Sequence, residues 1–126
     1  MSRICLIEDD PIMGESLADR FTLEGFACDW HRNARSAVAA LKTHRYAVAI
    51  SDYRLPDTDG VTLVKELRQT VGEPVPAILI SGEPNLLQLP DVAYSRLPVL
   101  RKPARGAALL LEMRRLLVAV TDDPET

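Results

Sequence analysis

Residues 4–11 read ICLIEDDP, in which a run of four apolar residues passes directly into three acidic residues and a proline. Apolar runs without polar alternation are typical of strands that are buried on both faces, as in parallel sheets. The carboxylates of Glu8, Asp9 and Asp10 follow the run so closely that each pair repels by roughly 1 to 4 kcal/mol, depending on the effective dielectric. The stretch therefore predicts a buried strand whose carboxyl end faces a positive charge.

Runs of the same kind recur along the 126-residue chain, separated by segments with helical spacing. The expected strands are ICLI (4–7), FACDW (26–30), YAVAI (46–50), PAILI (76–80) and LPVL (97–100). The expected long helices cover residues 11–24, 34–43, 59–71 and 104–120. Between Gly82 and Leu97, two prolines leave only NLLQL for the fourth of five helices, which we expect to be short or irregular. This alternation predicts an α/β fold with a five-stranded parallel sheet of order 2-1-3-4-5, doubly wound with five helices.

Two details of these elements can also be predicted. Met13, Leu17, Phe21 and Leu23 form an apolar stripe in the first helix, and we expect this stripe to face the sheet. Pro98 lies inside the last expected strand, where its missing N–H is tolerated only at a sheet edge. The last strand is an edge in the order 2-1-3-4-5, so this proline supports the topology.

The composition limits the class of protein. The length fits one domain, which we place at residues 1–120, followed by a polar tail or linker at 121–126. A net charge of −3 without a basic cluster argues against direct binding of nucleic acid or of an anionic membrane, and no apolar run is long enough to span a bilayer. Cys5 and Cys28 have no neighbour at metal-ligand spacing, so we expect two free thiols and a reducing, cytoplasmic location.

Polar residues directly follow four of the expected strands. They are Glu8, Asp9 and Asp10 after the first strand, Ser51 and Asp52 after the third, Ser81 and Gly82 after the fourth, and Arg101, Lys102 and Pro103 after the fifth. In an open parallel sheet, ligands bind outside the carboxyl ends of the strands, so these groups share one rim. Carboxylate oxygens are the ligands that Mg²⁺ prefers. The rim therefore predicts a magnesium site that a lysine assists.

Four of these motifs, in this order, resemble the receiver domain of two-component response regulators, the CheY-like family. They are Glu8-Asp9, Asp52 with LPDTDG behind it, Ser81-Gly82 and Lys102-Pro103. Each motif alone is common, but each of the four closes an expected strand, and the resemblance covers roughly residues 3–118. It implies a signalling switch that accepts a phosphoryl group from a histidine kinase or a phosphotransfer protein, with Mg²⁺ as its cofactor.

The resemblance also implies a set of metal ligands. Asp9 would bind Mg²⁺ directly and Glu8 mainly through water, while Asp52 would supply a carboxylate and Arg54 its backbone carbonyl. Phosphoryl transfer depends mostly on alignment and charge neutralisation, which a divalent cation supplies.

Three residues have implied roles towards the phosphoryl group itself. Asp52 would be the acceptor and form an acyl phosphate, the Ser81 hydroxyl would bond the new phosphoryl group, and Lys102 would pair with a phosphoryl oxygen. The family also typically has a cis peptide bond between this lysine and the following proline, so we expect Lys102–Pro103 to be cis.

Other polar and aromatic residues near these motifs have structural explanations. Asp10 is expected to be the N-cap of the first helix, and Asp59-Gly60 to form a helix cap and turn. We expect His31 and His44 at the surface, and Trp30 and Tyr46 to pack rather than to bind a ligand.

The chain departs from the family pattern at two places. The position three before Lys102, usually Tyr or Phe, is Val99, which cannot provide the usual aromatic rotamer switch. The proline-broken stretch 83–98 lies where many receivers dimerise or contact their output, so we expect an unusual partner surface. Arg54 and Glu83 stand at positions that tune phosphoryl hydrolysis in the family.

Three other functions fit the sequence less well than the switch. A Mg²⁺-dependent aspartyl-phosphate phosphohydrolase of the haloacid-dehalogenase kind needs a second acid two residues after the nucleophile, where this chain has Arg54. A flavodoxin-like cofactor binder needs a Ser/Thr/Gly-rich loop after the first strand, where this chain has three acids. A scaffold that has lost phosphorylation would lack an acceptor or a metal ligand, and none is missing here.

The sequence identifies neither the donor kinase nor the output domain or partner protein. No output segment is recognisable after Val120, and the terminal TDDPET fits either a stand-alone receiver or a fragment of a regulator or hybrid kinase. The Met1 start fits an amino-terminal domain.

Overall fold

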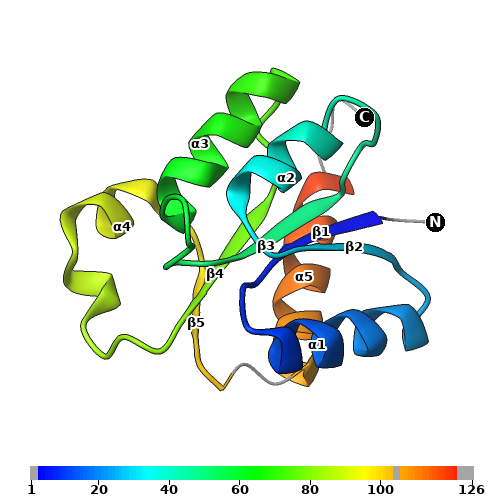
Figure 1. The fold of residues 1–126 in the computed structure, drawn as a ribbon, viewed down its shortest axis with the longest axis horizontal. Coiled ribbons are helices and arrows are strands. Elements are labelled where there is room, and N and C mark those ends of the chain that lie inside the picture. Colours follow the sequence, from blue (N-terminus) through cyan, green and yellow to red (C-terminus); the bar gives the residue numbers. More distant parts are fainter. Residues whose placement is uncertain (1–2, 104–105, 122–126) are drawn as a thin grey trace.

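A five-stranded parallel sheet runs through the molecule in the order β2-β1-β3-β4-β5, as the sequence predicts (Figure 1). The computed structural model describes residues 3–103 and 106–121, with side chains to residue 117. The strands are β1 (Arg3–Ile7), β2 (Ala27–His31), β3 (Val48–Asp52), β4 (Ala77–Ser81) and β5 (Val99–Arg101). The helices are α1 (Pro11–Leu23), α2 (Ala34–Ala40), α3 (Gly60–Val71), the 3-10 helix η1 (Leu86–Gln88), α4 (Pro90–Ser95) and α5 (Gly106–Thr121).

The two faces of the sheet carry separate hydrophobic cores, because successive strand residues point to opposite faces. Cys5 and Ile7 belong to the core under α2 and α3, whereas Ile4 and Leu6 belong to the core under α1 and α5. Figure 1 shows α2 and α3 on one side of the sheet and α1 and α5 on the other. Burial on both faces explains why the strands read as continuous apolar runs.

The strand predictions are confirmed with small shifts at the ends. β3 ends at Asp52 and β4 at Ser81, so both polar residues close their strands. Pro98 precedes β5, which begins at Val99, and the prediction that it lies inside the strand is wrong. Its carbonyl still accepts a hydrogen bond from the Leu79 N–H at 2.8 Å, and β5 is an edge strand as predicted. Proline lacks only the backbone N–H donor, so its carbonyl can still accept a hydrogen bond from the neighbouring strand.

One residue of the predicted stripe in α1 faces solvent. Leu17 and Phe21 are buried and Met13 is partly buried against the core, but Leu23 is 84% exposed. Leu23 lies two residues after Phe21, and successive helical residues are rotated by about 100° around the helix axis. Its side chain is therefore rotated by about 200° from that of Phe21 and points to the opposite face.

The fourth helix is short, as predicted, but it lies elsewhere. The NLLQL stretch forms only the 3-10 turn η1, and the six-residue α4 begins at Pro90 instead of ending before it. Pro90 occupies the first turn, where the missing N–H would have no intrahelical partner in any case. The proline therefore begins a helix here, and the prediction that the helix lies in NLLQL is wrong.

Several aromatic and histidine side chains outside the rim were also predicted. Trp30 and Tyr46 pack against the cores, and His44 is exposed. His31, expected at the surface, is half-buried, with its Nδ1 2.6 Å from the Ser36 hydroxyl oxygen. Its place at the end of β2 brings its ring under the start of α2.

The remaining expectations concern the thiols and the chain end. Both cysteines are free, as predicted, with Cys5 buried and Cys28 half-buried. Within residues 3–103 and 106–121, no helix combines the length and apolar character needed to cross a bilayer. Of the predicted tail, residues 122–126 lie outside the described residues, and α5 extends to Thr121.

The contrast between two leucines of α1 can be tested by matched substitutions. Leu17→Ala removes a side chain that is 4% exposed, so we expect the free energy of unfolding to fall by about 2 to 5 kcal/mol. Leu23→Ala, in the same helix, should change it by no more than about 0.5 kcal/mol. Urea unfolding followed by circular dichroism measures both, and equal losses would contradict the assigned faces of α1.

Candidate functional site

The carboxyl ends of β1, β3, β4 and β5 bring the predicted polar residues to one rim of the sheet. Parallel pairing places Ile7 beside Ser51, Asp52 beside Ile80, and Ser81 beside Arg101. Glu8 follows β1 directly, and Lys102 follows β5 directly. The four elements therefore deliver two carboxylates, a hydroxyl and an ammonium group to the same edge.

Lys102 lies between the two buried carboxylates. Its Nζ donates a hydrogen bond to Asp52 Oδ2 at 2.8 Å and lies 2.9 Å from Glu8 Oε1. The Glu8 side chain is 0% exposed and that of Asp52 is 8% exposed, so both charges are shielded from water. Buried carboxylates are costly unless they are paired, and the lysine supplies the pairing charge.

A third carboxylate completes an acidic cluster. Glu8, Asp9 and Asp52 each offer an oxygen within 4.8 Å of the others, and Asp9 is exposed to solvent. The buried Glu8 Oε1 lies 2.9 Å from the Lys102 ammonium, which is its charged partner. Three carboxylates against one ammonium leave an excess of two negative charges. That charge excess and the clustered carboxylate oxygens both fit a divalent cation, which prefers oxygen ligands.

The electrostatics of the buried pair follow from burial and from the shared lysine. Burial raises the pKa of Glu8 to about 7, the neighbouring Asp52 carboxylate adds to the rise, and Lys102 partly offsets it. Burial disfavours the charge on Lys102, but hydrogen bonds to Asp52 and Glu8 outweigh it and hold the pKa of Lys102 above its usual value. The lysine therefore stays charged, and Glu8 takes up a proton at a higher pH than an ordinary glutamate does.

Ser81 and the lysine are joined through the backbone. The Lys102 N–H donates to the Ser81 carbonyl at 2.8 Å, and the buried Ser81 hydroxyl oxygen accepts from the Glu83 N–H at 3.0 Å. The Lys102–Pro103 peptide bond is cis, which confirms the prediction. The ends of β4 and β5 thus reach the rim as one hydrogen-bonded unit.

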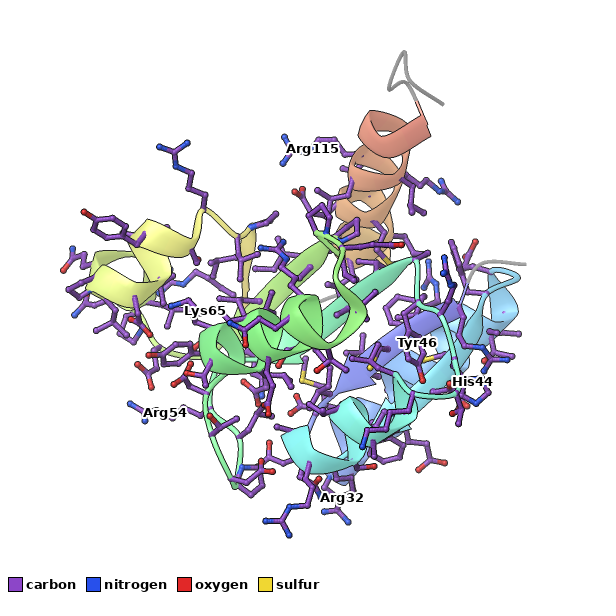
Figure 2. All side chains as sticks on the ribbon, turned by 90° about the horizontal axis from the view of Figure 1, so that it is seen from above. Arg32, His44, Tyr46, Arg54, Lys65 and Arg115 are labelled. Atoms are coloured by element: carbon purple, nitrogen blue, oxygen red, sulfur yellow. The ribbon has the colours of Figure 1, made fainter. Side chains whose placement is uncertain are left out.

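Arg54 and Glu83 form an ion pair that the sequence did not predict. The Arg54 Nε bonds a Glu83 carboxylate oxygen, and the arginine side chain is 76% exposed. Figure 2 shows Arg54 extending outward from the loop after β3. The pair joins that loop to the segment after β4, so it bridges the two chain segments that carry Asp52 and Ser81. Positions 29 residues apart in sequence give no signal for such pairing.

The loop between β3 and α3 is held by acidic side chains that bond backbone N–H groups. Asp57 accepts from the N–H groups of Ala34 and Arg35 at 3.0 Å each, and so caps α2 from a distant loop. Asp59 caps α3 by accepting from the Thr62 N–H at 2.8 Å, as predicted. The role of Asp57 was not predicted, because a cap contributed by another segment leaves no local pattern.

Gly60 is required where α3 begins. Its N–H donates to the Tyr53 carbonyl, and a Cβ at this position would lie 2.7 Å from the Asp52 carbonyl oxygen. Because glycine has no side chain, the first turn of α3 can pack closely against the end of β3. This contact fixes the backbone of Asp52.

Comparison with known proteins now identifies the family. Residues 4–114 match the sequence model of the response regulator receiver domain. The chain belongs to this family. Receiver domains are phosphorylation-activated switches of two-component signalling, which agrees with the resemblance found in the sequence.

Relatives and solved receivers agree with this assignment. The chain is 33% identical over 84 residues to the transcriptional regulatory protein QseB of Haemophilus influenzae, covering 67% of this chain and 38% of that protein. It is 34% identical over 67 residues to BasR of Escherichia coli, covering 53% and 30% of the two chains. The chain therefore spans well under half the length of these curated relatives.

The fold matches solved receiver structures over almost the whole chain. The chemotaxis response regulator CheY4 of Vibrio cholerae superimposes with a TM-score of 0.83 at 22% identity, covering 93% of this chain and 99% of that one. A CheY-like receiver domain of Methylobacillus flagellatus gives a TM-score of 0.81 at 26% identity, covering 92% and 98%. This receiver has the CheY-like fold.

The raised pKa of Glu8 gives a pH-dependent stability in metal-free protein. The pKa lies at about 7 in the folded state against an ordinary value of 4.5, so the folded state binds this proton more tightly than the unfolded chain. The contribution of Glu8 to stability therefore falls as the pH rises from about 4.5 to 7. We expect Glu8→Gln to be more stable than wild type above pH 7 and to lose that advantage at pH 4.5.

Urea unfolding in the presence of a chelator at both pH values measures this difference. The exposed carboxylate of Glu15 on α1 provides the control, since Glu15→Gln should change stability little at either pH. A Glu8→Gln protein that is less stable than wild type by the same amount at both pH values would show that the ion pair outweighs burial.

Proposed function

We propose that this receiver accepts a phosphoryl group on Asp52 from a histidine kinase or a phosphotransfer protein, and that the acyl phosphate is its active state. The observation that carries the proposal is the ammonium of Lys102 lying 2.8 Å from a nearly buried Asp52 carboxylate, beside two further acids. The acceptor carboxylate, the ammonium that would neutralise a phosphoryl group and the acids that would hold a cation therefore lie together at one rim.

The protein contributes little covalent chemistry to the transfer beyond the acceptor carboxylate. An Asp52 oxygen would attack phosphorus as the P–N bond of a donor phosphohistidine breaks. The electron pair of that bond stays on the imidazole nitrogen, which then takes up a proton from water. In this structure Lys102 donates a hydrogen bond to Asp52. During transfer it would donate to a phosphoryl oxygen instead and neutralise part of the negative charge of the phosphoryl group.

Glu8, Asp9 and Asp52, together with the Arg54 backbone carbonyl, would hold a Mg²⁺ ion. When bound, this ion offsets the repulsion between the acceptor carboxylate and the donor phosphate. The clustered carboxylate oxygens support the first three ligands. Arg54 lies in the loop two residues after Asp52, where its backbone pairs with Asp59 in an isolated bridge, and this fixes the loop close to the cluster.

Ser81 would donate a hydrogen bond to the new phosphoryl group. Its oxygen already accepts from the Glu83 N–H, which leaves its own O–H to be directed towards the rim. Because the Lys102 N–H bonds the Ser81 carbonyl, a shift of either side chain towards the phosphoryl group would carry the ends of β4 and β5 with it.

Catalysis would be limited to the domain's own phosphorylation and dephosphorylation. A phosphohydrolase acting on phosphate esters needs a proton donor two residues after the nucleophile, and Arg54 cannot lose a proton at neutral pH. The Arg54 guanidinium is also engaged by Glu83. The arrangement supports a switch over an enzyme with an external substrate.

Signal output would pass to a further domain or a partner protein, with no nucleic-acid or membrane contact by this domain. The net charge of −3 supports that division, and the names of the relatives place receivers of this kind in transcriptional regulatory proteins. The two free thiols favour a reducing, cytoplasmic compartment.

The acceptor can be tested by intact mass after incubation with acetyl phosphate and Mg²⁺. We expect wild type to gain the mass of one phosphoryl group and Asp52→Asn to gain none, because an amide is not a nucleophile for this transfer. Asp10→Asn is the matched control, since Asp10 caps α1 through the Ile12 N–H at 3.0 Å and asparagine also caps helices.

Each contrary outcome has a distinct meaning. Phosphorylation of Asp52→Asn would place the acceptor elsewhere, and an unmodified wild type at saturating donor would overturn the switch. Steady hydrolysis of simple phosphate esters that Asp52→Ala abolishes would instead favour the phosphohydrolase.

A further inference from the structure

The end of β2 holds the loop that carries Glu8 and Asp9 at three points. The Glu8 N–H donates to the His31 carbonyl at 2.9 Å, the Trp30 indole Nε1 donates to the Glu8 carbonyl at 2.9 Å, and Arg32 Nη2 donates to the Asp9 carbonyl at 3.1 Å. Three consecutive residues of one segment thus bond three backbone groups of the acidic loop. Two of the three bonds come from side chains and therefore depend on residue identity.

The indole reaches the Glu8 carbonyl because α1 leaves room for it. Gly14 lies against the ring, and a Cβ on this residue would lie 2.2 to 2.4 Å from Trp30 ring atoms, which no side chain could tolerate. The ring itself is partly buried against the core under α1 and α5. Gly14 of α1 therefore leaves the space that the Trp30 ring occupies, and this position lets the indole N–H reach the acidic loop.

The bond matters for cation binding because of which carbonyl it holds. The Glu8 carbonyl belongs to the peptide plane between Glu8 and Asp9, so fixing its direction also fixes where the Asp9 backbone points. The carboxylates of Glu8, Asp9 and Asp52 cluster within 4.8 Å and repel one another. Without a restraint, rotation of this peptide would let Asp9 swing away and relieve the repulsion.

We propose that Trp30 is a positioning residue for cation binding: its indole N–H locks the Glu8–Asp9 peptide so that both carboxylates face Asp52 before the ion arrives. The inference rests on the proposed function, in which these three acids hold a divalent cation. Trp30 touches neither ion nor phosphoryl group, and it acts through the backbone of Glu8.

A purely structural role would depend on the shape of the ring, whereas positioning depends on the N–H. The chain contains one tryptophan, so a tryptophan auxotroph grown with an analogue substitutes this position alone. β-(3-Benzothienyl)alanine keeps the bicyclic shape but replaces N–H by sulfur, and 7-azatryptophan keeps the donor. Arg32 is less suited to the test, because its removal also changes the charge near the acids.

Calorimetric titration with Mg²⁺ and amide hydrogen exchange at Asp9 and Asp10 in metal-free protein are the two measurements. We expect the benzothienyl protein to bind Mg²⁺ roughly twofold to tenfold more weakly, the factor that one neutral hydrogen bond represents, and to exchange faster in this loop. The azatryptophan protein should match wild type in both. Trp30→Phe, which also lacks the donor, should weaken Mg²⁺ binding as well and serves if the benzothienyl protein does not fold.

The outcomes separate this inference from the function on which it rests. Equal Mg²⁺ affinity and equal exchange for the two analogues, with wild type binding Mg²⁺, would overturn the role of Trp30 and leave the function intact. A wild type that binds no Mg²⁺ would overturn the metal site and the positioning role together.

Discussion

Lys102, held between the carboxylates of Glu8 and Asp52, is the interaction on which the rest of the site depends. Burying two carboxylates so close together is costly without an opposite charge, and Lys102 supplies that charge to both. The lysine can occupy this place only because parallel strands β1, β3 and β5 end at the same rim. The fold therefore brings together Glu8, Asp52 and Lys102, which are distant in sequence, with the lysine within hydrogen-bonding distance of both acids.

Much of this arrangement could be predicted from the sequence, because it follows from periodicity and from strand ends. Continuous apolar runs indicated the parallel sheet, and residues placed directly after the runs had to share its rim. The errors arose where side-chain direction or chain path decides the outcome. Leu23 lies two residues after Phe21, so it points away from the apolar stripe of α1. Pro90 begins α4, although proline more often interrupts a helix.

Three contacts between distant segments could not be predicted from the sequence. The Arg54–Glu83 pair, the Asp57 cap on α2 and the Trp30 bond to Glu8 each join segments more than 20 residues apart. None follows a local spacing rule, so only the folded chain brings the partners together. Such contacts decide the geometry of the site, whereas the local patterns decide only which residues reach it.

The region expected to transmit the signal differs from the family pattern in a consistent way. Val99 in β5 offers no aromatic ring to change rotamer, and α4 has six residues with Tyr94 at 92% exposed. Tyr53, the residue after the acceptor, donates a hydrogen bond to Asp91 in the first turn of α4 at 3.0 Å. The Tyr53 side chain therefore links the residue after Asp52 directly to this short helix.

The acids of the rim are also divided by function: Asp10, Asp57 and Asp59 each bond backbone N–H groups at a helix start. The remaining cluster of three carboxylates faces one lysine, and its excess of two charges matches a divalent ion. Until such an ion binds, the raised pKa of Glu8 lets a proton carry part of that excess.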